Sequence, residues 1–323
     1  MPAAMVLAWA RRAAWCAGVL LAGCTSLIPQ TVALRNDWPE GVPPTAELAQ
    51  LPFGPQHAAY QGGPAALAMA MGHAGARVSA QALVDEGWLA RHRNGLQREM
   101  LAAPRRHGLV SYRIAPRYVD LLREIAAGHP VVVLLDLGTI LTEWQYAVVN
   151  GFDHGTGTIL LRSGLQSRQQ MTFSDFERAW IAGGYWAMVV TPPERIVATA
   201  TESEWLEALL GLARGGDLDA AVRGYRTALA RWPDSLPAAV GLANQLHARG
   251  SLDESAAVLR TARQRHPQSV IVLNNLAQTL SDQGRDREAL SLIESGNDPQ
   301  SPFAGEVRAT RQLIEQRLRS RGG

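Results

Sequence analysis

The sequence predicts two folded domains of different class, an α+β domain followed by an all-α helical solenoid. Two observations support this prediction. In the first part of the chain, segments with helical spacing precede segments rich in apolar, β-branched residues. In the last third, Gly and Pro recur at a constant interval. A chain of 323 residues, 47% hydrophobic and 19% charged, has room for a core in each domain.

The N-terminal residues are typical of an export signal. Two arginines precede an apolar run from Ala13 to Leu21, which ends in Leu21-Ala22-Gly23-Cys24. The run is too short for an uncleaved anchor helix, because a bilayer span needs roughly 20 apolar residues. The segment resembles a lipoprotein signal peptide with its lipobox. The resemblance implies that residues 1–23 are removed and that Cys24 receives lipid.

Thr25 follows the cysteine, and in the resembled signals a residue other than Asp favours export to the outer membrane. We therefore expect a lipoprotein that faces the periplasm of a Gram-negative bacterium. Cys16 leaves with the signal, so no thiol remains in either folded domain, which excludes a disulfide framework and a cysteine zinc site. The balance of 31 basic and 29 acidic residues argues against a nucleic-acid partner, and no histidine cluster indicates a metal or other cofactor.

Residues 24–50 contain four prolines and no sustained periodicity, so we interpret them as a lipidated tether. The first domain is expected over residues 51–195, with helices before an antiparallel series of strands. Ser174 is a plausible cap for a short helix before the last strand. The expected helices are 64–74, 79–90, 96–107 and 117–127, and the expected strands are 131–135, 145–152, 158–162 and 186–191.

The second domain shows a 34-residue period. Gly216, Gly250 and Gly284 are separated by 250 − 216 = 34 and 284 − 250 = 34 residues, and Pro233 and Pro267 repeat the interval. This is the length of a tetratricopeptide repeat. We predict three repeats and a capping helix over residues 201–320. Supporting apolar positions are Trp205, Ala221, Tyr225, Ala228, Leu242, Ala243, Ala262, Leu276, Ala277 and Ala289.

The segment from Gln56 to Leu67 resembles the nucleophile motif of papain-like cysteine peptidases. Together with the order of elements, it resembles the bacteriocin-processing family, family thirty-nine, in its lipoprotein form with tetratricopeptide tails. The resemblance implies a papain-like fold and places the oxyanion donor on Gln56 and the nucleophile on Gly62, before Gly63-Pro64. The alternative roles are structural: Gln56 as a buried amide and Gly62 as a turn residue.

The resemblance places the general base on Gln145, at the start of the strand that ends in Gly151-Phe152-Asp153. An amide cannot accept a proton near neutral pH. The position that orients the base falls in Arg162-Ser163-Gly164, which contains no carboxylate. Catalysis by this site is therefore not expected, because nucleophile, base and orienting residue are all missing.

Three functions compete. The first is an inactive peptidase-like domain, a pseudopeptidase, whose cleft binds peptide while the repeats bind a second partner. The second is an active peptidase or amidase that uses an unassigned nucleophile such as Ser163. The third is an assembly scaffold that acts through the repeats alone. In a repeat stack the first helix of each unit lines the concave face. Candidate peptide-binding residues there are Arg214, Asn244, His247, Asn274 and Gln278.

Overall fold

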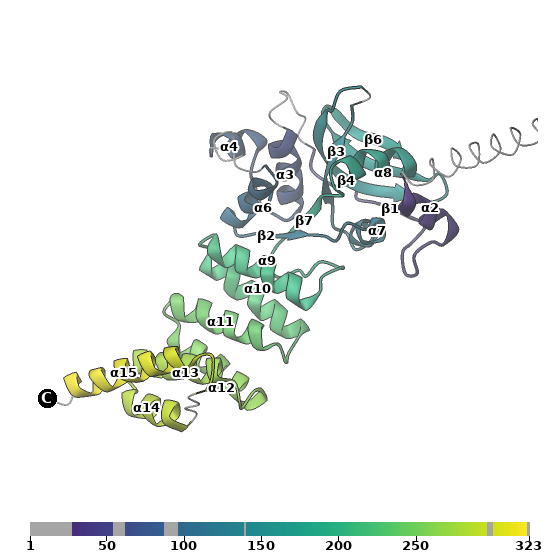
Figure 1. Cartoon of the computed structure of the whole chain (residues 1–323). Coiled ribbons are helices and arrows are strands. Elements are labelled where there is room, and N and C mark those ends of the chain that lie inside the picture. The colour runs from purple at the N-terminus through teal and green to yellow at the C-terminus, as the bar shows by residue number, and fades with distance from the viewer. Residues whose placement is uncertain (1–27, 54–61, 87–95, 139, 296–299, 322–323) are drawn as a thin grey trace, which may run out of the picture. The chain divides into compact units, whose positions relative to one another are not determined.

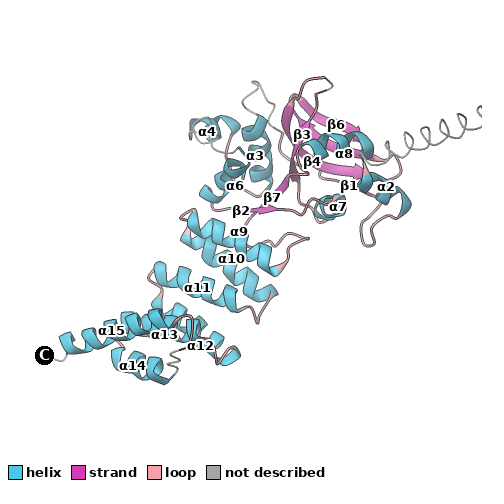
Figure 2. Ribbon diagram, in the orientation of Figure 1, coloured by secondary structure: helices cyan, strands magenta, loops and turns pink. Residues whose placement is uncertain are grey.

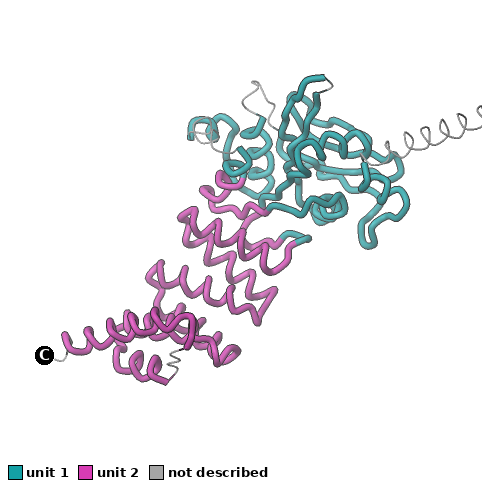
Figure 3. Tube along the Cα trace, in the orientation of Figure 1, with its two compact units in different colours: residues 1–100, 113–190, 197–199 teal, residues 101–112, 191–196, 200–323 magenta. Residues whose placement is uncertain are grey.

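The computed structural model describes residues 28–53, 62–86, 96–138, 140–295 and 300–321. The chain divides into two compact units (Figure 3). Unit 1 contains residues 1–100, 113–190 and 197–199, and unit 2 contains residues 101–112, 191–196 and 200–323. Cys24 and Gln56 lie outside the described residues, so the structure does not bear on either position.

Unit 1 combines helices with an antiparallel sheet (Figure 2). Its helices are α2 (Pro29–Asn36), α3 (Gly62–His73), α4 (Ala80–Asp85), α7 (Tyr118–Ala126) and α8 (Phe173–Ala182). Its strands are β1 (Thr45–Glu47), β3 (Val131–Asp136), β4 (Trp144–Asp153), β5 (Thr158–Ser163), β6 (Gln166–Thr172) and β7 (Ala187–Thr191). The boundary between the units falls within α6 (Leu96–Arg106) and β2 (Val110–Arg113). Helices thus precede most of the strands, as the sequence predicts.

The strands of unit 1 pair in the order β7-β3-β4-β5-β6, and β1 adds to β4. Val131 of β3 lies opposite Val149 of β4 and also opposite Val189 of β7. Strand β3 is buried along most of its length because it has a neighbour on each side and helices pack on it. Its continuous apolar sequence, Val131 to Leu135, reflects that burial.

Gly151 permits the pairing between β1 and β4. A Cβ at Gly151 would lie 2.7 Å from the carbonyl oxygen of Ala46, so only glycine lets β1 approach this closely. The register of β4 against β5 shifts between Val149 and Gly151, which is a β-bulge at the same place. Gly151, which the sequence analysis placed at the end of the strand that carries the general-base position, therefore has a structural role in the sheet.

An aromatic cluster forms the core beside the sheet. Tyr118 of α7 packs edge-on against Phe173 and Trp180 of α8, with ring centroids 5.7 and 5.9 Å apart. Helix α8 is capped by Thr172, whose Oγ1 accepts from the N–H of Asp175 at 3.1 Å. The sequence analysis placed this cap at Ser174, which is wrong by two residues: Ser174 already lies in the first turn, where its side chain cannot occupy the capping position.

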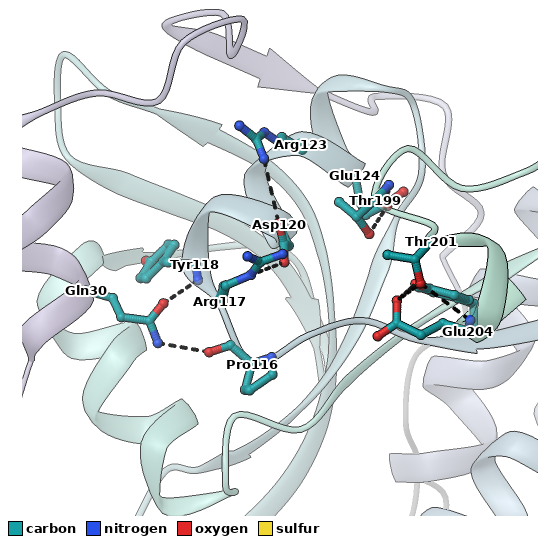
Figure 4. Close-up of polar contacts among 11 residues, drawn as sticks. Gln30, Pro116, Arg117, Tyr118, Asp120, Arg123, Glu124, Thr199, Thr201 and Glu204 are labelled. Carbon is teal, nitrogen blue, oxygen red and sulfur yellow. Dashed lines mark hydrogen bonds and ion pairs between the residues drawn. The ribbon is translucent and has the colours of Figure 1, made fainter.

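Residues 29–47 contain regular elements, whereas the sequence analysis expected a tether without sustained periodicity over residues 24–50. Residues 29–36 form α2, and Thr31 and Leu34 of this helix are buried. The Gln30 side chain donates to the carbonyl oxygen of Pro116 and accepts from the N–H of Tyr118 (Figure 4). The segment lacks a sequence signal because its contacts join it to residues more than 80 positions away.

Strands β1, β2 and β6 were not among the predicted elements, and one predicted helix is only partly described. Strand β6 was not predicted because its sequence, Gln166 to Thr172, is polar and mostly exposed on both faces, as suits an edge strand. Strand β2 is too short to show a periodicity. Helix α4 is capped by Ser79 and ends at Asp85, whereas residues 87–90 of the predicted helix lie outside the described residues. The remaining predicted elements agree with the structure within one or two residues.

Unit 2 is a stack of antiparallel helix pairs (Figure 1). The pairs are α9 (Glu202–Arg214) with α10 (Leu218–Arg231), α11 (Leu236–Ala248) with α12 (Leu252–Arg265), and α13 (Val270–Asp282) with α14 (Asp286–Ser295). Helix α15 (Ala304–Arg321) follows and packs on α13 and α14 through buried Val307 and Ile314. This arrangement confirms the prediction of a helical stack that ends in one further helix.

The 34-residue period has a conformational cause. Gly216, Gly250 and Gly284 have φ values of 94°, 82° and 82°, a left-handed conformation that favours glycine at the turn between the two helices of a pair. Each first helix is capped by a hydroxyl side chain at the same interval. Thr201, Ser235 and Ser269 accept from the N–H three residues ahead, at 235 − 201 = 34 and 269 − 235 = 34. The supporting apolar positions named from the sequence are all buried.

Candidate functional site

The peptidase-like positions of unit 1 are partly brought together. Gly62 begins α3, and α3 packs on β4 and β3. Gln145 is the second residue of β4 and is half-buried. Its Nε2 lies 3.3 Å from the point where a Cβ on Gly164 would stand, so its amide covers the turn after β5. Gln145 and this turn are therefore adjacent, as the resemblance implies, whereas Gln56 is not described.

The third position of the expected triad holds a structural arginine. Arg162 is 9% exposed and donates to the carbonyl oxygens of Leu51 and Ala49, which ties the segment before α3 to β5. Burial lowers the pKa of Arg162, and the charge of Glu47 opposes that effect. A cation held by two backbone carbonyls cannot orient a histidine as a carboxylate does.

Ser163, the alternative nucleophile, lies inside the fold. It is 5% exposed, and its Oγ makes no hydrogen bond to any described group. A serine nucleophile needs a general base within hydrogen-bond reach, about 2.6–3.2 Å. Within the described ranges, the structure places no such base on Ser163.

In unit 2 the predicted peptide-binding residues lie on the first helices of the three pairs. Arg214, Asn244 and Gln278 are exposed, on α9, α11 and α13 respectively. Asn274 and His247 are half-buried. The Oδ1 of Asn274 is buried and has no hydrogen-bond partner among the described groups. This face therefore presents side-chain amides and one guanidinium.

Two of these residues also connect neighbouring repeats. Asn244 accepts a hydrogen bond from Nδ2 of Asn275, at 3.1 Å. His247 Nε2 lies 2.8 Å from Oδ2 of Asp282, whose Oδ1 accepts from Nη1 of Arg317 at 2.7 Å. We call His247, Asp282 and Arg317 the polar ladder, because they join α11, α13 and α15.

The environment of Asp282 stabilises its charged form. Burial alone would raise the pKa of Asp282, but hydrogen bonds from Arg317 and His247 outweigh burial and hold the pKa below its usual value. The sequence analysis named His247 but missed Asp282 and Arg317. Asp282 is one period after Ala248, 282 − 248 = 34, so the repeat register could have placed it on this face. Arg317 lies in the final helix, outside the regular period.

Two hollows lie in equivalent positions of successive repeats, one between α10 and α12 and the other between α12 and α14. One, of about 440 Å³, is lined mainly by small and apolar side chains such as Leu229 and Val258. The other, of about 730 Å³, contains Arg263 and Leu292 at the positions 34 residues later. The second hollow is more polar, because Arg263 occupies the position equivalent to Leu229 in the first. The two hollows therefore do not form one continuous apolar groove.

The described residues show neither a metal cluster nor a membrane span. Within the described ranges, no group of three or more His, Cys, Asp or Glu residues is arranged to hold a metal ion. The search for a helix long and apolar enough to cross a membrane, made over the same residues, found none.

Comparison with known proteins bears on unit 2. The family model of the tetratricopeptide repeat matches residues 206–270 and 242–302. No curated protein matches the chain. The matched residues extend from α9 to the end of α14, the same helices that form the stack. Residues 206–302 are tetratricopeptide repeats, preceded in the chain by a domain built around an antiparallel sheet.

Proposed function

We propose that this protein is a lipid-anchored, protein-binding module of the bacterial envelope, in which the tetratricopeptide stack holds a peptide segment of its partner. The repeat match and the polar face of α9, α11 and α13 carry the proposal. Stacked helix pairs offer an extended surface that suits a partner lacking a compact fold. Lipid on Cys24 and a periplasmic location rest on the signal-peptide resemblance.

The side chains of this face favour a peptide backbone as the bound group. Amides both donate and accept hydrogen bonds, as peptide groups do. The exposed amides of Asn244 and Gln278 carry the observation of most weight, because a peptide group that meets them can both donate and accept a hydrogen bond. The exposed guanidinium of Arg214 adds a site for a carboxylate.

The binding test compares two triple variants of the soluble chain from Thr25 onwards, in photo-crosslinking to peptides from the envelope proteome. The face variant carries Arg214→Ala, Asn274→Ala and Gln278→Ala. A matched control removes one exposed arginine and two exposed amides elsewhere, Arg287→Ala, Gln264→Ala and Gln268→Ala. We expect capture to fall about tenfold or more in the face variant and to change less than twofold in the control, which corresponds to about 1.4 kcal/mol or more. Equal loss in both variants would overturn the assignment of this face.

For unit 1, we propose an inactive, papain-like domain related to the bacteriocin-processing cysteine peptidases, a pseudopeptidase. The order of helices and antiparallel strands, glycine at position 62 and an amide at position 145 support this proposal. The buried position of Ser163 and the structural role of Arg162 speak against an active peptidase or amidase.

Three measurements decide among the three candidate functions. The unmodified chain is expected to cleave no peptide in a library, and turnover abolished by Ser163→Ala would favour the active enzyme. The double variant Gly62→Cys, Gln145→His tests the papain-like geometry, because it supplies the missing thiol and base. Thiol-dependent cleavage would support the resemblance. If unit 2 alone recovers the same partners as the full chain, the scaffold function replaces the pseudopeptidase.

A further inference from the structure

The first described residues of the chain are fixed to unit 1. Glu177 of α8 is fully buried, and its two carboxylate oxygens accept the backbone N–H groups of Gln30 and Thr31 at 2.9 and 2.6 Å. These N–H groups belong to the first turn of α2, which has no side-chain cap of its own. The carboxylate thus caps α2 from another helix, and it satisfies donors that would otherwise stay unpaired.

Further contacts hold the same segment along its length. Thr31 is fully buried, and its Oγ1 donates to the carbonyl oxygen of Phe173 at 3.1 Å. Trp38 stacks on His154 with ring centroids 4.1 Å apart. Strand β1 then pairs with β4. From Pro29 to Glu47, the chain is therefore part of the fold of unit 1.

This attachment changes how far a lipid anchor can be from the folded protein. If residues 24–50 were an extended tether, they would reach about 90 Å at roughly 3.5 Å per residue. Fixed structure instead begins at Pro29, 29 − 24 = 5 residues after Cys24, which limits the reach to about 17 Å. That distance is about half the thickness of the hydrocarbon core of a bilayer, which is about 30 Å.

The attachment also selects one end of the sheet. Trp38 contacts His154, in the turn between β4 and β5, so the N-terminal segment lies at that end of β4. The opposite end carries Ile140, Leu141 and Trp144, which are 95%, 83% and 55% exposed. Strand β4 has ten residues between the two ends, or about 30 Å.

We propose that the lipid on Cys24 holds unit 1 directly against the membrane surface, with α2 nearest to the lipid and the apolar connection between β3 and β4 facing away. The inference rests on the proposed lipidation of Cys24 and adds the orientation of unit 1 to it. The partner of the α2 end is the lipid surface that carries the anchor. The exposed apolar side chains are then presented to the aqueous compartment.

Fluorescence energy transfer in vesicles tests this orientation. The lipidated full-length protein is reconstituted in phosphatidylethanolamine and phosphatidylglycerol vesicles that carry an acceptor dye on their head groups. Labelling is selective because the mature chain has no cysteine besides Cys24, whose sulfur carries the lipid. Donors are placed by Ala33→Cys on α2 and by Thr142→Cys between β3 and β4, both at exposed positions. We expect at least about twofold stronger quenching for Ala33→Cys, given the separation of about 30 Å.

A linker insertion is the matched control. About 20 Gly and Ser residues added before Ile28 extend the reach by an r.m.s. distance of about 25 Å, so the two donors should then be quenched nearly equally. Labelling with radioactive palmitate reports lipidation independently. Lipidated protein with equal quenching before insertion would overturn this orientation alone. Absence of palmitate on the unmodified chain would overturn the proposed anchor and, with it, this inference.

Discussion

Within unit 2, neighbouring repeats are held together by contacts that recur at the repeat interval. Within unit 1, distant parts of the chain are held together by contacts that occur once. Equivalent pairs of unit 2, separated by 34 residues, are Arg226–Glu254 with Arg260–Glu288, and Arg249–Asp219 with Gln283–Asp253. In unit 1, Glu177 bonds Thr31, 146 residues away, and Glu124 bonds Thr199, 75 residues away. Figure 4 shows the second of these contacts.

The difference teaches where each unit is sensitive to substitution. The repeated pairs of unit 2 are on the surface, where one ion pair contributes about 0–1 kcal/mol, and neighbouring repeats supply similar pairs. The carboxylates of Glu124 and Glu177 are fully buried, and each satisfies three or more donors. Removal of a buried acceptor leaves these donors unpaired, so unit 1 should depend strongly on single residues.

The largest effect is expected from Glu177→Ala. It removes the acceptor of Gln30 N–H, Thr31 N–H and Tyr185 Oη, so we expect unit 1 to lose about 3 kcal/mol of unfolding free energy. Urea unfolding, with hydrogen exchange resolved by peptide, measures the loss and locates it at α2 and α8. Glu143→Ala, an exposed carboxylate of the same unit, should cost less than about 0.5 kcal/mol. Similar costs for the two variants would contradict the capping role.

The second prediction concerns packing between the first two repeats. A Cβ at Gly241 would lie 2.4 Å from the ring of buried Tyr225, so Gly241→Ala should destabilise unit 2 by about 2 kcal/mol. Gly305→Ala on α15 meets nothing within 4 Å and should stabilise by up to about 1 kcal/mol through helix propensity. The change in unfolding temperature of each variant measures these effects. If Gly305→Ala also destabilises unit 2, the expected gain in helix propensity on α15 is contradicted.

The third prediction tests the polar ladder. Asp282→Asn removes the charge held by Arg317 and His247 and should cost unit 2 about 1 kcal/mol at neutral pH, because the site is only half-buried. The pKa of Asp282 is lowered in the fold. Its contribution is therefore present above the unfolded pKa, near 3.9, and is lost as pH falls through the folded value.

The pH dependence provides the check on this prediction. Between about pH 5 and pH 2, the unfolding free energy of unit 2 should fall more steeply in the unmodified chain than in Asp282→Asn. Asp253→Asn, at an exposed position on α12, is the control and should leave the slope close to that of the unmodified chain. Parallel slopes for the unmodified chain and Asp282→Asn would show that the ladder does not contribute through charge.

The smallest effect is expected from Tyr146→Phe in β4. The Tyr146 hydroxyl is buried and has no partner among the described groups, so its removal should leave stability unchanged or raise it by about 0.5–1 kcal/mol. Burial raises the pKa of Tyr146, which disfavours ionisation in the fold. The variant should therefore lose less stability above pH 10 than the unmodified chain. A loss greater than about 1 kcal/mol at neutral pH would reveal a partner for the hydroxyl.

The repeats could be predicted because every signal needed was local. Gly250 marks a turn that requires positive φ, Ser235 caps the helix before it, and both recur at the interval of the fold. The candidate face followed from the same register, and Arg214, Asn244 and Gln278 are indeed exposed on the first helices. The contacts of His247 were not predicted, because its partner Asp282 belongs to the following repeat and Arg317, which binds Asp282, belongs to the final helix.

In unit 1 the apolar strands were predicted and the polar edge was not. The continuous apolar sequence from Val131 to Leu135 predicts a buried strand, whereas the exposed side chains of β6 show no apolar alternation. Helix α2 was missed for a related reason. Its stabilising partner, Glu177, lies at the other end of the unit in sequence, and nothing near Pro29 indicates it.

The sequence by itself determined the stack, the interval of its turns and the absence of any thiol from residues 25–323. These properties depend on residue type and on local backbone conformation. Only the tertiary structure decided that residues 29–47 belong to unit 1, that Arg162 ties backbone carbonyls and that His247 meets Asp282. These outcomes depend on which distant groups satisfy buried donors and acceptors. Tertiary packing brings those groups together, and no short segment of the sequence specifies them.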